Sequence, residues 1–217
     1  FFYYEIYGFG YKGVNADDET VLAYYAFKAF EAGQNPYAIS IKNILLSNAT
    51  TYGFTLTTSN HIIDYFDYPS LFMLLMAPFY YFSGQIAATA IKASDSLAYL
   101  VFLALALIAF AASISKSRLK NLKSIMPALS IFILYFVQIL SVQYIVIAIA
   151  LIAIFYSIDK RYSFLVLGIA ASLQELLWVP ILLVIAYTAS KQGVKTGIIT
   201  AVGAIAVFLL INGYFLI

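Results

Sequence analysis

The stretch GIAASLQELLWVPILLVIAY, residues 168–187, decides the class of fold. Gln174 and Glu175 interrupt a run that is otherwise apolar and about 20 residues long, the length of helix that crosses a lipid bilayer. The chain of 217 residues has the same character throughout, with 64% hydrophobic and only 10% charged residues. A soluble domain carries about 25% charged residues. We therefore predict an all-α fold, a polytopic transmembrane helical bundle.

The apolar runs predict where the membrane segments lie. They cover residues 1–12, 71–91, 96–115, 124–141, 143–158, 163–189 and 196–217. No internal repeat separates them, so we expect a single transmembrane domain over 1–217, with its membrane helices at about 71–217. The chain begins with Phe1 and stops inside an apolar run, and we expect it to be truncated at both ends.

Charge is divided unevenly along the chain. The loop 14–69 holds six acids against two lysines, a net charge of −4, whereas the clusters at 116–123, 159–161 and 191–195 are basic. Short cytoplasmic loops are rich in Lys and Arg, so we expect the loop 14–69 to lie outside a cell membrane that the chain crosses several times. A simple count of crossings cannot place every basic cluster in the cytoplasm, and the sequence leaves this conflict open.

Several classes of site and partner are excluded or weakened by composition. The net charge of only +2 argues against a nucleic-acid partner. The chain has no cysteine and a single histidine, which excludes disulfides, thiolate chemistry and a histidine-rich metal site. Asn48 opens the sequon Asn-Ala-Thr and is a candidate glycosylation site in the outer loop.

The outer loop contains a predicted amphipathic helix from about Asp18 to Gly33. A polar stripe runs along one face, and apolar residues fill the rest, so we expect the helix to lie flat on the membrane surface. The stripe consists of Thr20, Tyr24, Lys28 and Glu31. Gly33 is the expected stop, and the Asn35-Pro36 pair turns the chain away.

Three adjacent acids, Asp17, Asp18 and Glu19, stand at the start of this helix. One interpretation is helix capping, with Asn15 or Asp17 as the cap and the following acids near the positive end of the helix dipole. The other is chemical, with one carboxylate acting as a general base just outside the bilayer. Asp17 and Asp18 could also hold a divalent metal ion through oxygen ligands.

Two further polar groups lie beside predicted membrane segments. Asp64 and Asp67 precede the helix that starts near residue 71, among tyrosines typical of an interfacial aromatic belt. Gln174 and Glu175 are either an intramembrane polar site, which is a functional hypothesis by default, or a helix break at the membrane surface. The sequence does not choose between these two interpretations.

The order of these motifs resembles the GT-C class of membrane glycosyltransferases, in the mannosyltransferase-like branch that uses polyprenyl-phosphate-linked sugars. The resemblance rests on the acid pair Asp18-Glu19, the helix ending in GQNPY, the long outer loop, and DYPSL leading into the next helix. GIAASLQELLWVPILL is similar to a later helix of that class. The resemblance implies that Asp18 is the catalytic carboxylate. It implies a set of substrate-binding residues: Asp17, Glu19, Asn35, Tyr37, Asp67, Tyr68, Gln174 and Glu175.

The activity implied by the resemblance is inverting transfer of a hexose on the outer face of the membrane. The donor would be a polyprenyl-phosphate sugar whose lipid tail lies between helices, and the acceptor a glycan or a protein. Asp18 would take the proton of the acceptor hydroxyl. No cofactor is required, although a divalent metal ion is compatible with the acids.

The chain departs from the family pattern at two positions. The usual Tyr-Pro-Pro reads Tyr68-Pro69-Ser70, and Gln174 stands where a lysine would meet the lipid phosphate. Loss of that cation weakens a phosphate contact. The alternative is therefore a non-catalytic accessory subunit of a larger membrane complex, built on a degenerate copy of the fold. A small transporter ranks third, because only Glu175 and Asp95 would supply charge within the membrane.

Overall fold

A computed structural model describes residues 18–47, 59, 61–82, 97–98, 100–105, 108, 142–158 and 160–215. This part of the chain contains helices and no strand, which confirms the all-α prediction for the described residues. The helices of the N-terminal part are α2 (Asp18–Glu31), η1 (Pro36–Ala38), α3 (Lys42–Ser47) and α4 (Ser70–Phe82). Those of the C-terminal part are α7 (Val142–Ser157), α8 (Ser163–Ala171), η2 (Glu175–Leu177), α9 (Trp178–Gln192), α10 (Val194–Asn212) and η3 (Gly213–Phe215).

The chain groups into two compact units. The first comprises Phe1–Asp67 and Phe72–Leu100, and the second comprises Tyr68–Leu71 and Val101–Ile217. The division passes through the start of α4, so the Tyr68-Pro69-Ser70 segment belongs to the second unit. The expectation of one continuous transmembrane domain stays a prediction, and each unit is described separately below.

Helix α2 ends at the residue that the sequence indicates, and its described part begins at Asp18. Its last turn closes at Gly33, which has a φ of 71°. The backbone N–H of Gly33 donates to the carbonyl of Phe30 (3.0 Å), and that of Gln34 donates to the carbonyl of Ala29 (2.9 Å). These two bonds form the Schellman motif, which needs a residue with positive φ and therefore favours glycine.

The surface of α2 differs from the prediction. Lys28 is exposed, but Thr20 and Tyr24 of the expected polar stripe are buried, as are Val21 and Leu22 on the opposite side. A helix that is buried around most of its circumference is a core helix rather than one lying flat on a surface. The expectation failed because the Thr and Tyr side chains carry enough apolar surface to pack inside a core, whatever their polar groups suggest.

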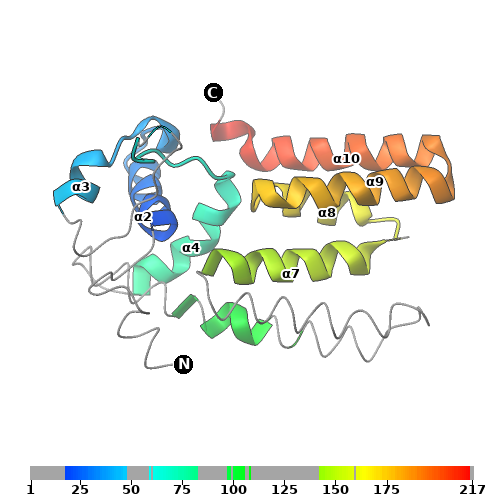
Figure 1. Cartoon of the computed structure of the whole chain (residues 1–217), viewed down its shortest axis with the longest axis horizontal. Coiled ribbons are helices and arrows are strands. Elements are labelled where there is room, and N and C mark those ends of the chain that lie inside the picture. Colours follow the sequence, from blue (N-terminus) through cyan, green and yellow to red (C-terminus); the bar gives the residue numbers. More distant parts are fainter. Residues whose placement is uncertain are drawn as a thin grey trace. The chain divides into compact units, whose positions relative to one another are not determined.

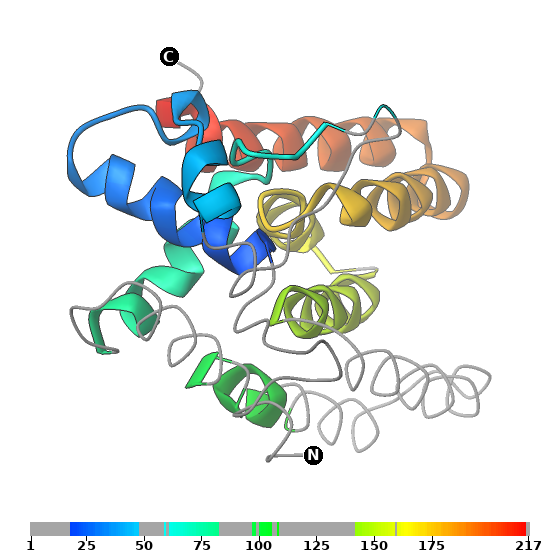
Figure 2. The same cartoon turned by 60° about the vertical axis from the view of Figure 1, so that its left-hand side comes forward.

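The second unit is built around four helices, α7 to α10, that lie side by side (Figures 1 and 2). Glycines allow close approach between them: a Cβ added to Gly168 of α8 would lie 2.5 Å from the Cβ of Val207, and one added to Gly197 of α10 would lie 2.5 Å from the Cβ of Ala189. Small residues at such contacts let helix backbones pack closely, as in membrane helix pairs.

The predicted membrane segment 163–189 is wrong as a single span. The structure divides it into α8, of 9 residues, and α9, which starts at Trp178. Ser172 and Gln174 lie in the break: the Ser172 hydroxyl donates to the Gly168 carbonyl, and the Gln174 side chain accepts from the backbone N–H of Glu175. Pro180 stands in the first turn of α9, a position that tolerates a residue without an N–H. Gln174 and Glu175 are the polar signal of this break in the sequence, which left a break and an intramembrane site as alternatives.

One helix of the described residues is long and apolar enough to cross a membrane, the continuous Val194–Phe215 with a mean hydropathy of 2.2. The apolar parts of α4 and α7, Ser70–Tyr81 and Ile145–Ser157, are shorter. The predicted segments at 1–12 and 124–141 lie outside the described residues. The structure thus supports one crossing, and several crossings remain an expectation.

Candidate functional site

The acid pair of the expected catalytic site begins α2. Asp18 is the first helical residue and Glu19 the second. A carboxylate in the first turn of a helix lies near backbone N–H groups that favour its ionised form. Asp17 and the glycosylation candidate Asn48 lie outside the described residues. The backbone position of Asp18 suits either capping or proton acceptance, the two interpretations that the sequence leaves open.

Asn35 and Tyr37 lie beyond the other end of α2, which spans about 20 Å at 1.5 Å per residue. The side-chain Oδ1 of Asn35 accepts a hydrogen bond from the backbone N–H of Tyr37 (2.9 Å) and so caps η1. The structure therefore separates these two expected substrate-binding residues from Asp18 by the length of the helix.

The segments 34–41 and 61–67 form a loop pair in the first unit. The ring of Tyr37 packs against that of Phe66, with centroids 5.5 Å apart. The backbone N–H of Ile41 donates to the carbonyl of Asp64 (2.9 Å), and the Ser40 hydroxyl donates to the Asp64 carboxylate. Asp67 follows Phe66 and is exposed, so the loop pair brings Asn35, Tyr37 and Asp67 into one region.

Burial raises the pKa of the Tyr37 phenol to about 12. The hydroxyl therefore stays protonated near neutral pH, because removal of its proton would leave a charge in a poorly hydrated place. Tyr37 can offer a hydrogen-bond donor or an aromatic face to a ligand. It is unsuited to act as a base.

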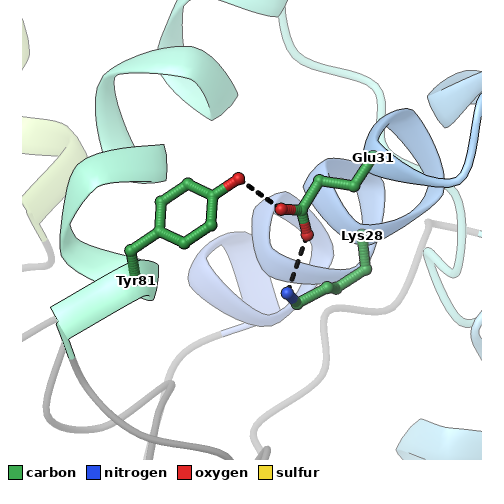
Figure 3. A network of polar contacts seen from close by, with 3 residues as sticks. All are labelled: Lys28, Glu31 and Tyr81. Atoms are coloured by element: carbon green, nitrogen blue, oxygen red, sulfur yellow. Dashed lines mark hydrogen bonds and ion pairs between the residues drawn. The ribbon is translucent and has the colours of Figure 1, made fainter.

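A polar network at the C-terminal end of α2 was not predicted (Figure 3). The Nζ of Lys28 lies 2.7 Å from the Glu31 carboxylate, and the Tyr81 hydroxyl donates to the other oxygen of that carboxylate. The Lys28 ammonium also lies 5.9 Å from the ring centroids of Tyr24 and Phe27, within cation–π range. Spacing of i and i+3 in the sequence signals the ion pair, but nothing local points to Tyr81.

The network fixes the charge states of its two ionised members. The hydrogen bond to Glu31 raises the pKa of Lys28, partly opposed by burial. The hydrogen bonds from Lys28 and then from Tyr81 lower the pKa of Glu31. Both side chains are therefore held in their charged forms, so Glu31 is a poor candidate for a general base.

A buried polar cluster in the second unit centres on Asn212. Its Oδ1 accepts hydrogen bonds from the backbone N–H (2.9 Å) and the hydroxyl (2.7 Å) of Ser70. Its Nδ2 donates to the Ser172 hydroxyl (3.0 Å) and to the Phe208 carbonyl (2.9 Å). The Ser172 hydroxyl donates in turn to the Gly168 carbonyl (2.9 Å). We call Ser70, Ser172 and Asn212 the Asn212 hub; all three are at least 97% buried.

The hub joins two motifs that are far apart in the sequence. The backbone N–H of Leu71 donates to the carbonyl of Ser172 (3.2 Å), which adds a main-chain bond to the side-chain ones. Tyr68 precedes this contact on one segment, and Gln174 and Glu175 follow it on the other. The structure thus brings these three expected substrate-binding residues to the same corner of the second unit.

Gln174 itself is occupied by the fold. It is 2% exposed, and its Oε1 accepts from the backbone N–H of Glu175 (2.9 Å), which caps η2. Glu175 is exposed. The structure shows a helix break at this pair, while its place at a membrane surface and a role as an intramembrane polar site both stay predictions.

Comparison with protein-family models, curated proteins and solved structures finds no match to this chain. No function can therefore be transferred from a known protein. Among the described residues, no group of three or more His, Asp or Glu side chains is placed to hold a metal ion. A metal ion held by Asp17 and Asp18 stays a prediction, because Asp17 is not among those residues.

Proposed function

We propose that the chain is a membrane glycosyltransferase of the GT-C type, which moves a hexose from a polyprenyl-phosphate donor to an acceptor on the outer face of the membrane. The observation that carries the proposal is the start of α2 at Asp18. Helix α2 is buried along most of its length from Thr20 onward, so the backbone that carries Asp18 belongs to a packed helix, and a general base needs such a positioned backbone.

The proposed reaction is a single inverting displacement. An acceptor hydroxyl attacks the anomeric carbon, a new C–O bond forms, and the bond from that carbon to the phosphate oxygen breaks. Asp18 accepts the hydroxyl proton, and the polyprenyl phosphate leaves with the electron pair of the broken bond. The resemblance also assigns substrate contacts to Asn35, Tyr37 and Asp67 of the first unit and to Tyr68, Gln174 and Glu175 of the second, and these assignments are part of the proposal.

The meeting of two motif segments supports the same proposal. In the resemblance, the Tyr-Pro segment leads into a membrane helix, and the later polar pair meets the lipid phosphate. In this chain Asn212 bonds both Ser70 and Ser172, and the backbone N–H of Leu71 donates to the Ser172 carbonyl, so the two segments are held together. Chance placement of two unrelated segments would not require such contact.

Replacement of Asp18 by Asn tests the chemistry directly. We expect membranes that contain Asp18→Asn to lose transfer of labelled sugar from a polyprenyl-phosphate donor, because the amide cannot accept the proton. Glu31→Gln is the matched control, since Glu31 lies at the other end of the same helix and is paired with Lys28. Unchanged transfer by Asp18→Asn, with normal amounts of folded protein, would remove Asp18 from the mechanism.

A second candidate function, a non-catalytic accessory subunit, is favoured by the internal roles of Ser70 and Gln174. Both replace family residues, and both are engaged in the fold rather than directed to a ligand. This candidate predicts that the chain co-purifies in mild detergent with other membrane subunits, and that Asp18→Asn leaves the activity of that complex unchanged. Transfer by the purified chain alone would exclude it.

The location that we propose is a cell membrane crossed several times, with the acidic loop 14–69 outside. The supporting observations are the apolar span Val194–Phe215 and the acidic charge of the loop. The chain has no cysteine, so Asn48→Cys would carry the only thiol. A membrane-impermeant maleimide should label this variant on intact cells; labelling only from the cytoplasmic side would overturn the proposed topology.

A further inference from the structure

Helix α10 buries its small and polar side chains and exposes its large aliphatic ones. The buried set is Gly197, Thr200, Ala204 and Asn212. The exposed set is Val194, Ile198, Ile199, Val202, Ile205, Leu209 and Leu210. A soluble protein does the reverse, because large aliphatic side chains gain most from leaving water.

Helix α9 is apolar on both faces. Ile181, Val184 and Thr188 are buried, and the neighbouring face is exposed and also apolar. That face consists of Val179, Leu182, Leu183 and Tyr187. Together the two helices expose a continuous apolar surface, far beyond the scattered apolar residues that a soluble surface carries. Small residues inside and large apolar residues outside are the pattern of helices surrounded by lipid.

The two helices form an antiparallel hairpin. The rings of Trp178 and Phe208 meet at one end, with centroids 6.2 Å apart, and Ala189 meets Gly197 toward the other. Gly193 makes the turn between them with a φ of 96°. From Lys195 to Tyr214 the arm formed by α10 is about 28 Å long at 1.5 Å per residue, close to the hydrocarbon thickness of a bilayer, about 30 Å. Helix α9, with 15 residues, is about 22 Å long.

The two ends of the hairpin differ in chemistry. The turn carries Lys191 and Lys195, both exposed, and the opposite end carries the exposed aromatic rings of Trp178 and Tyr214. Lysines near a span mark the cytoplasmic side, and Trp and Tyr mark membrane interfaces. Only 17% of the most apolar window of Val194–Phe215 is buried, which argues against the core helix of a soluble protein.

From these observations we propose that α9 and α10 form a bilayer-spanning hairpin whose outer face is covered by lipid acyl chains, with the Gly193 turn at the anionic cytoplasmic leaflet. Trp178 and Tyr214 then lie toward the outer interface, on the same side as the Asn212 hub. Phospholipid is the occupant that fits, because one surface offers both an apolar face of bilayer length and cations at one end. The inference rests on the membrane location proposed above.

Trp178 is the single tryptophan of the chain, so quenching of its fluorescence by brominated lipids measures its depth in the bilayer. In vesicles of the full chain, lipids brominated near the headgroup should quench Trp178 more than lipids brominated near the chain end. The matched probe is Trp178→Phe with Val202→Trp, on the exposed middle of α10, for which the order should reverse. Equal depths for the two probes would overturn the hairpin. Failure of either lipid to quench the Val202→Trp probe would show that protein, such as a second copy, covers this face.

Orientation is tested by thiol labelling on intact cells. An impermeant maleimide should label Tyr214→Cys from outside, and should reach Lys195→Cys only after the membrane is opened. The opposite result, or equal access to both positions, would overturn the orientation. Extraction with alkaline carbonate separates this inference from the proposal beneath it. A chain that stays in the membrane pellet but fails the depth test refutes the hairpin and leaves the membrane location standing.

Discussion

At the scale of single residues, Asn212 makes hydrogen bonds that the sequence does not predict. An amide side chain has one carbonyl oxygen and two N–H donors. In Asn212 the oxygen accepts two hydrogen bonds and the nitrogen donates two. Its principal partner, Ser70, is 142 positions away, so no local pattern predicts the contact. The only signal available was the presence of an amide within the apolar run near the end of the chain.

The serine at position 70 is the departure from the GT-C pattern that the structure explains. Ser70 is the first residue of α4, where a proline would suit the helix, but proline has no N–H to donate to Asn212. We expect Ser70→Pro to lower the free energy of unfolding by about 1–3 kcal/mol, the cost of an unsatisfied buried polar group.

Ser70→Ala is the control for that substitution. It removes the hydroxyl bond but keeps the backbone N–H, so its cost should be smaller, about 1 kcal/mol. Denaturant unfolding of the two variants in detergent gives the comparison. An equal loss in both would show that the backbone bond contributes nothing.

Glu31 gives the second expectation at this scale, a dependence of stability on pH. Hydrogen bonds from Lys28 and Tyr81 lower the pKa of the folded carboxylate below its ordinary value of 4.5. A group with a lowered folded pKa contributes stability above its unfolded pKa, and this contribution is lost as the pH falls through the folded value. The wild-type chain should therefore lose more stability than Glu31→Gln as the pH falls below about 4.5.

The measurement is the apparent melting temperature of each chain across that acidic range. Lys28→Met serves as a second probe, because it removes the first partner of Glu31 and should flatten the curve in the same direction. Because the pair is exposed, the difference should be small. Parallel curves for wild type and Glu31→Gln would contradict the assignment.

At the scale of elements, sequence predicted α2 better than the later helices. Its stop at Gly33 depends on local chemistry, a glycine with positive φ, which is visible in the sequence. Which face of α2 is buried depends on other segments, and the expected polar stripe was wrong at Thr20 and Tyr24. The break after α8 was left open, because Gln174 and Glu175 indicated either a break or an intramembrane site.

The turn between α9 and α10 provides a test at this scale. Gly193 has a φ of 96° and a ψ of 151°, a region open essentially to glycine alone. No atom lies within 4 Å of an added Cβ, so any cost of Gly193→Ala is backbone strain rather than a clash. We expect a loss of about 1–3 kcal/mol in the free energy of unfolding.

Gly213→Ala is the matched control. Gly213 also has free space for a Cβ, but its φ of −59° is helical. Alanine at such a site should be neutral or stabilising by about 0.4–1 kcal/mol, because it restricts the unfolded chain. Similar effects of the two substitutions would show that the turn at Gly193 is not strained by a side chain.

At the scale of the whole molecule, composition correctly indicated helices, and one of them has the length and hydropathy of a membrane span. The number of crossings could not be read from apolar runs, because a run such as 163–189 contains two helices. For the site, sequence indicated three groups of residues but could not show their distances. Asp18 and Asn35 lie at opposite ends of α2, whereas Tyr68 and Gln174 lie next to segments that the hub joins.

Charge reversal at the hairpin turn tests the orientation of the chain. If Lys191 and Lys195 hold the turn in the cytoplasm, Lys191→Glu with Lys195→Glu should increase the fraction of chains inserted in the opposite sense. Maleimide access to Tyr214→Cys from outside should then fall. Lys191→Arg with Lys195→Arg keeps the charge and should leave access unchanged; a fall in that variant would show that charge is not the cause.

The Asn212 hub also affects how fast Asn212 is deamidated. Asn212 is followed by Gly213, and asparagine before glycine is the pair most prone to deamidation, since the glycine nitrogen can attack the side-chain amide carbon and release ammonia. In the folded chain that amide is buried and held by four hydrogen bonds, away from the geometry of attack. Each opening of the hub exposes it to a reaction that ends in a carboxylate, which cannot donate to Ser172. The fraction of chains deamidated at Asn212 would therefore increase with the number of times that the hub has opened.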